Sequence, residues 1–87
     1  MCRNIKRLHN VEPPVADAEV RDAALQFVRK ISGTTRPSRV NAEAFERAVD
    51  EIAAAAGRLL DSMVASAPPA DREALAAKAR RRWQAQQ

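Results

Sequence analysis

The sequence is poor in the residues that build most metal and redox sites: among 87 residues it has one cysteine, one histidine and no tyrosine. A lone cysteine, Cys2, cannot form a disulfide within the chain, which favours a reducing compartment. We therefore expect a cytoplasmic protein. Cys2 and His9 fall short of the four protein ligands of a structural zinc site, so we expect neither a metal nor a cofactor in a single chain.

Catalytic groups are equally scarce. The chain has two glycines, so it lacks a glycine-rich loop for phosphates. A Cys2–His9 pair would need an orienting group and an oxyanion site, and the sequence supplies neither. The acids of the second predicted helix fall on its outer side, where they face solvent; they are Glu43, Glu46, Asp50 and Asp61. The sequence predicts that the protein is not an enzyme.

Long hydrophobic runs are also absent. No stretch approaches the ~18–20 consecutive apolar residues that cross a bilayer. The residues from Met1 to Leu8 carry charges with no apolar stretch behind them, which is not the pattern of a signal peptide or an anchor. We expect no membrane contact.

The length of the chain limits its stability. Residues 1–87 are expected to form one small domain. A core of this size supplies only about 3–5 kcal/mol of net stability, so help from self-association is expected.

Three stretches show the three-and-four spacing of apolar residues that predicts amphipathic helices. The first helix is expected to begin at Asp17 and to stop at Ser32-Gly33. The second is expected to begin at Asn41 and to stop before Pro68-Pro69. The predicted organisation is an N-terminal segment 1–16, a helix 17–31, a loop 32–41, a helix 42–65 and a helix 71–84.

The apolar stripes predict how these helices pack. The first helix presents Val20, Ala24, Phe27, Val28 and Ile31. The second presents Phe45, Ala48, Val49, Ile52, Ala56, Leu59, Leu60 and Met63. The third helix is expected either to dock through Leu75 and Trp83 or to fray beyond Ala79. The N-terminal segment is expected to cover the hairpin with Ile5, Leu8 and Val11. Because no stretch alternates like a strand, the predicted fold class is all-α: a helical hairpin with a shorter C-terminal helix and an N-terminal extended or turn segment packed on it.

Several short motifs point to a known family. They are Met1-Cys2-Arg3-Asn4-Ile5, Glu12-Pro13-Pro14, the run from Ala23 to Lys30, Ser32-Gly33, Pro37-Ser38, Ala44-Phe45 and Ala48-Val49. With these motifs, roughly residues 1–70 resemble a family of small uncharacterised bacterial proteins, known only as a domain of unknown function. The resemblance implies a helical fold and carries over no activity, substrate, cofactor or site residue.

Positive charge gathers in the loop between the first two helices and near the C-terminus of this small basic protein, whose net charge is +4. Guanidinium groups, hydroxyls and the free N–H groups of a helix start bind phosphates well. One hypothesis is therefore non-specific binding of nucleic acid or another polyanion through Arg36, Ser38, Arg39, Arg80, Arg81 and Arg82. The plainer interpretation is that these residues cap turns and face solvent.

The second predicted helix is longer than the first, and its end is apolar. Leu59, Leu60, Met63 and Val64 exceed what the first helix covers, although the N-terminal segment and third helix are alternative covers. Uncovered apolar surface on a small helical protein is commonly a contact site. The leading hypothesis is thus a non-enzymatic interaction module, with a second copy or another protein as its partner, and polyanion binding is the alternative.

Overall fold

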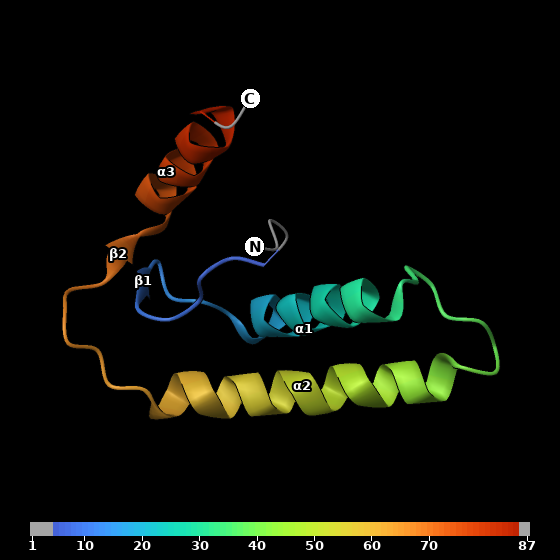
Figure 1. Cartoon of the computed structure of the whole chain (residues 1–87). Helices are drawn as coiled ribbons and strands as arrows, with labels where there is room; N and C mark the ends of the chain where they lie inside the picture. The colour runs from blue at the N-terminus through green and yellow to red at the C-terminus, as the bar shows by residue number, and fades with distance from the viewer. Residues whose placement is uncertain (1–4, 86–87) are drawn as a thin grey trace.

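The structure, a computed structural model, describes residues 5–85 (Figure 1). The elements along the chain are β1 (Val11–Glu12), α1 (Asp17–Ser32), α2 (Ala42–Ser62), β2 (Ala70–Asp71) and α3 (Arg72–Ala85). The predicted all-α class is confirmed: α1 and α2 form the packed hairpin, and the strands of the described chain are a single two-residue pair.

Helix α1 begins at the predicted residue but with a different cap. We expected Asp17 to be the N-cap; the N-cap is Ala16, in an extended conformation. The Ala16 N–H donates to Oε1 of Glu19 at 3.1 Å, and the Glu19 N–H donates to the Ala16 carbonyl at 2.9 Å. The Glu19 carboxylate accepts the hydrogen bond from the Ala16 N–H, so the start of the helix is stabilised without a side-chain cap from Asp17. Gly33 ends the helix as predicted, with φ 72° and its N–H donating to the Arg29 carbonyl.

Helix α2 begins after Asn41 as predicted but ends at Ser62, three residues before the predicted end. Met63 is already extended, with φ −73° and ψ 136°. The prolines were expected to stop the helix; the chain leaves it earlier because residues 63–69 must travel from the end of α2 to β2 (Figure 1). Asn41 does not cap through its side chain, since its amide donates to Oγ of Ser38 instead.

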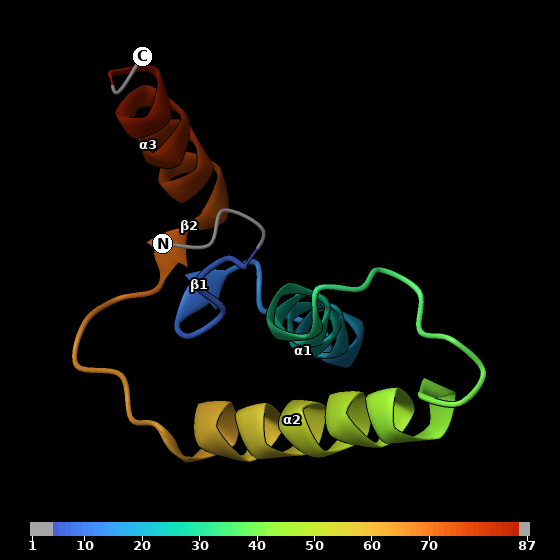
Figure 2. The same cartoon turned by 45° about the vertical axis from the view of Figure 1, so that its right-hand side comes forward.

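The core lies where the two helices meet. Its buried members are Ala24 and Val28 of α1 and Phe45 and Val49 of α2, with Leu25, Ala48, Ile52 and Ala53 packed around them. In Figure 2 α1 is seen nearly end-on while α2 is seen from the side, so the helices cross. Crossing helices touch over a short length and diverge beyond it. This explains why Phe27 and Ile31, both predicted to face the core, are 42% and 66% exposed.

A clasp between the two ends of the hairpin was not predicted. β1 and β2 pair in parallel, with Val11 opposite Ala70. Asn10, at φ 52°, donates through Nδ2 to the carbonyls of Ala67 (3.0 Å) and Pro68 (3.3 Å), and its own carbonyl accepts from the Ala70 N–H. Val11 is buried, as expected of the N-terminal segment. Two-residue strands are too short to show an alternating pattern, so the sequence carried no signal for this clasp.

Helix α3 is anchored at its start and leans away from the hairpin in both views (Figures 1 and 2). Asp71 caps it by accepting the Glu73 N–H at 2.8 Å, and Arg72 pairs with Glu19 of α1 at 2.8 Å. The helix continues to Ala85, so it does not fray after Ala79. None of its residues is buried, and Leu75 is half-buried.

Candidate interaction surface

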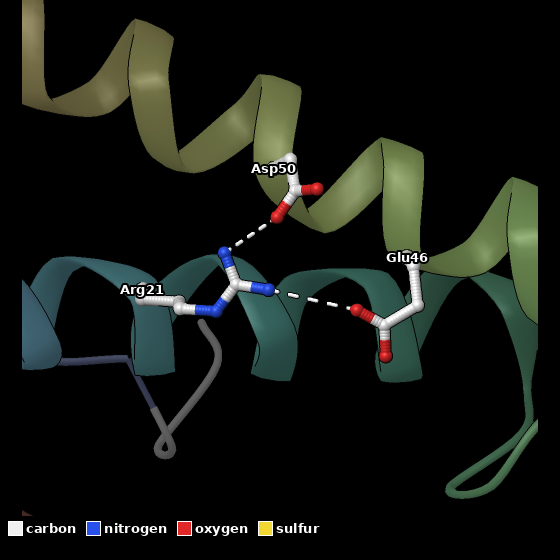
Figure 3. Close-up of polar contacts among 3 residues, drawn as sticks. All are labelled: Arg21, Glu46 and Asp50. Carbon is white, nitrogen blue, oxygen red and sulfur yellow. Dashed lines mark hydrogen bonds and ion pairs between the residues drawn. The ribbon is translucent and has the colours of Figure 1, made fainter.

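One arginine holds α1 and α2 in register. Arg21 of α1 reaches α2 with its two terminal nitrogens: Nη1 lies 2.6 Å from Oδ1 of Asp50, and Nη2 lies 3.6 Å from Oε2 of Glu46 (Figure 3). These acids were expected only to face solvent. Helix α1 has 16 residues and α2 has 21, and Ala53 is the last residue of α2 that packs against the buried core.

Helix α2 extends past the start of α1, as Figure 1 shows. Leu59, Met63 and Val64 are 57%, 44% and 92% exposed, and Leu60 is half-buried. The sequence left the N-terminal segment and α3 as alternative covers of this surface, and neither buries Leu59, Met63 or Val64. Helix α3 leans away from the hairpin in both views.

The exposed apolar residues continue along α2 as a narrow line, which we call the open edge: Ala48, Ile52, Ala55, Leu59 and Met63. Ala55, Leu59 and Met63 are exposed, and Ala48 and Ile52 are half-buried. The successive spacings of four and three residues keep Ala48, Ile52, Ala55 and Leu59 on one side of the helix, and Met63 follows the helix as its C-cap. Our prediction treated the apolar residues of α2 as a single stripe against α1. In the structure Ala48 and Ile52 still pack against the core shared with α1, and the open edge runs from them along the margin of the stripe to the exposed Ala55 and Leu59.

The chain as a whole has more surface than its mass requires. Its accessible surface is 6986 Å², whereas a compact monomer of this mass exposes about 5,100 Å². The radius of gyration is 15.1 Å, against about 12 Å for a compact domain of this length. The molecule is flat, with extents of 44 × 37 × 16 Å. A thin, open shape of this kind is typical of a chain that completes its core against a partner.

The connector between α1 and α2 uses its polar groups internally. Ser38 accepts from the Asn41 amide, the Thr34 hydroxyl donates to the Arg36 carbonyl, and the Thr34 N–H donates to Oγ of Ser32. Arg36 and Arg39 are exposed and take part in no ion pair of residues 5–85. A hollow of about 380 Å³ lies beside the connector, yet neither arginine nor Ser38 lines it. The predicted phosphate-contacting groups are not gathered around a site.

The two predicted basic clusters lie far apart. Arg36 and Arg39 belong to the connector at one end of the hairpin, whereas Arg80, Arg81 and Arg82 lie on α3 beyond the other end (Figures 1 and 2). All five side chains are exposed. The structure therefore does not bring the bases onto one continuous face.

A comparison with protein families identifies the chain. The model of an uncharacterized conserved protein family, DUF2277, matches residues 1–78. The chain belongs to the DUF2277 family. The match includes the connector and the whole of α2, and it ends before Arg80. None of the curated proteins matches, and none of the solved structures matches.

Within residues 5–85, this DUF2277 protein gathers no group of three or more His, Cys, Asp or Glu side chains that could hold a metal ion. Nor is any helix of that range both long and apolar enough to span a bilayer. A second hollow, of about 290 Å³, lies between the N-terminal segment and α1, lined by Lys6, Leu8, Ala18, Glu19, Asp22 and Ala23. Cys2, of the Cys2–His9 pair weighed and set aside from the sequence, lies outside the described residues.

The Glu19 carboxylate links the start of α1 to the start of α3, and its pKa is held below the ordinary value of 4.5. The first cause is the hydrogen bond from the Ala16 backbone, and the second is the hydrogen bond from Arg72. A depressed pKa in the folded state means that the ionised carboxylate stabilises the fold above about pH 4.5. That contribution is lost as the pH falls through the lowered pKa.

We therefore predict that Glu19→Gln lowers the melting temperature at neutral pH and that the deficit shrinks on acidification below about pH 4.5. Glutamine keeps the shape but loses the charge-assisted bonds to Ala16 and Arg72. Thermal melts of both proteins from pH 7 to pH 3 measure the difference. Glu43→Gln is the control, because Glu43 is almost fully exposed and pairs only with Arg47 in the described chain. A deficit that stays constant with pH would contradict the assignment.

Proposed function

We propose that this DUF2277 protein is a non-enzymatic interaction module that binds a protein partner through the open edge of α2. The observation that carries the proposal is the excess surface of about 1,900 Å² over a compact monomer. A standard protein–protein interface takes about 800 Å² from each partner. The surplus is larger than the area of one such interface, and the exposed apolar side chains of α2 support placing the interface there.

Other functions draw less support. Polyanion binding was predicted from two basic clusters, but these lie at opposite ends of the molecule, and the Arg80–Arg82 cluster falls outside the family match. It stays an untested prediction. The single cysteine fits a reducing compartment, so we propose a cytoplasmic location.

The proposal predicts that Leu59→Glu weakens binding to the partner at least about tenfold. Leu59 is 57% exposed in the free chain, so the substitution leaves the hairpin core intact, but burial of the new carboxylate in an interface is unfavourable. Binding is measured by sedimentation of the purified chain for self-association and by capture on the immobilised chain for a different partner.

Val40→Glu is the matched control. Val40 is also apolar and is 91% exposed, but it lies in the connector, away from the end of α2. It introduces the same charge and should leave binding within about twofold of the original protein. Equal losses in both variants, or no loss with Leu59→Glu, would contradict the placement of the binding surface.

A further inference from the structure

The open edge of α2 has a seven-residue repeat that suits pairing with another helix. Ile52 and Leu59 are one repeat apart, and so are Ala48 and Ala55. The spacing 48, 52, 55, 59 is the three-and-four alternation of a two-helix seam. Along this seam a large residue alternates with alanine. A partner that fills the gaps over the alanines must carry large residues at the same intervals.

A second α2 has those residues when it runs in the opposite direction. In one antiparallel register Leu59 faces Ala48 of the second copy and Ile52 faces Ala55, and the twofold axis repeats both contacts in reverse. Every level of the seam combines one large side chain with one small one, which fills space without overlap.

The charges beside the seam match the same register. Glu51 and Arg58 are seven residues apart, and both flank the open edge on the side away from α1. Both are exposed, and neither forms an ion pair within residues 5–85. In the antiparallel register Glu51 of each copy lies beside Arg58 of the other, which gives two symmetric ion pairs. In a parallel pair Glu51 and Arg58 of the two copies would lie on opposite sides of the seam, so these ion pairs could not form.

We infer that the partner on the open edge is a second copy of this chain, docked antiparallel along α2, so that two hairpins form a symmetric dimer. The inference rests on the proposed function and goes further by naming the occupant. The side of α2 buried by α1 carries Phe45 and Val49, so α1 stays in place when the copies meet. The surplus surface of about 1,900 Å² per chain exceeds the ~800 Å² that each copy contributes to a stable interface.

Charge exchange at the flanking pair tests the inference with the full chain. Glu51→Arg and Arg58→Glu should each weaken the homodimer about tenfold, because each substitution replaces two pairs of opposite charge with two pairs of like charge. The double variant Glu51→Arg/Arg58→Glu should restore it. A mixture of the two single variants should form a heterodimer as tight as the original homodimer, because both contacts again join opposite charges. Sedimentation equilibrium measures the dissociation constants, and Glu43→Arg, outside the seam, is the control.

Cysteine pairs test the direction of pairing. In a Cys2→Ser background, one tagged chain carries Ala48→Cys and a differently tagged chain carries Leu59→Cys. Mild oxidation should join the two different chains and leave like chains unjoined. In the antiparallel register the like positions are roughly 16 Å apart, too far for a disulfide. Disulfides between like chains would indicate a parallel pair and overturn the register.

The outcomes separate this inference from the proposed function. The dimer is overturned, and the proposed function stands, under two conditions. The chain stays monomeric at millimolar concentration, and a different protein binds it but no longer binds the Leu59→Glu variant. If the chain is a monomer and its Leu59→Glu variant binds every partner of the original protein, both the dimer and the proposed function are overturned. A dimer that is indifferent to both charge reversals overturns the α2 seam.

Discussion

Replacing Phe45 with alanine is expected to unfold most of the protein. Phe45 is 9% exposed and is the largest side chain in the buried cluster with Ala24, Val28 and Val49. Truncation of a buried phenylalanine to alanine costs about 3–5 kcal/mol, because apolar contact is lost and a cavity remains. That cost equals the whole margin of about 3–5 kcal/mol expected of a chain this small. Far-ultraviolet circular dichroism during urea unfolding measures the change.

Phe27→Ala is the matched control for this prediction, because it removes the same atoms from a different environment. Phe27 is 42% exposed, at the margin of the α1 stripe, so the expected loss is below about 1 kcal/mol. The two variants are compared at one protein concentration, since association with a partner also stabilises the fold. Similar losses for both would show that the packed side of α1 has been assigned incorrectly.

Asn10→Ala is expected to open the clasp between the N-terminal segment and β2. Alanine at φ 52° is strained by about 1–2 kcal/mol. The substitution also removes the amide that donates to the carbonyls of Ala67 and Pro68, worth about 1 kcal/mol. The total of about 2–3 kcal/mol should reduce the protection of the Ala70 amide from hydrogen exchange by a factor of about 30 to 160. Protection within the α1 and α2 core should change little.

Asn10→Gly separates the two causes. Glycine adopts a positive φ without strain, so this variant loses only the hydrogen bonds and should cost less than half as much as alanine. Hydrogen exchange of Ala70 is the direct measurement, because its N–H donates to the Asn10 carbonyl. An Ala70 amide that stays fully protected in Asn10→Ala would mean that the clasp does not depend on Asn10.

The sequence by itself determined the helices. Apolar residues three and four apart, the stop at Gly33 and the start after Asn41 are local features, and they located α1 and the beginning of α2 correctly. The two helix lengths suggested an exposed end of α2 but left coverage by the N-terminal segment and third helix as an equal alternative; Leu59, Met63 and Val64 are exposed and Leu60 is half-buried. The family was correctly anticipated from short motifs.

Only the tertiary structure decided which side of each stripe is buried. Periodicity gives the side of a helix that is apolar, but the crossing of α1 and α2 decides how far along each helix that side is covered. For this reason Phe27 and Ile31 were assigned to the core and are exposed.

The clasp and the separation of the basic clusters also depend on contacts between residues far apart in sequence. Asn10 meets Ala67 and Pro68 across 57 and 58 residues, and no local pattern encodes such a meeting. The direction of α3 follows from that clasp and from the Glu19–Arg72 pair, and it separates Arg80–Arg82 from the connector. Local spacing sets secondary structure, whereas the relative placement of elements is set by packing and pairing that appear only when the chain is folded.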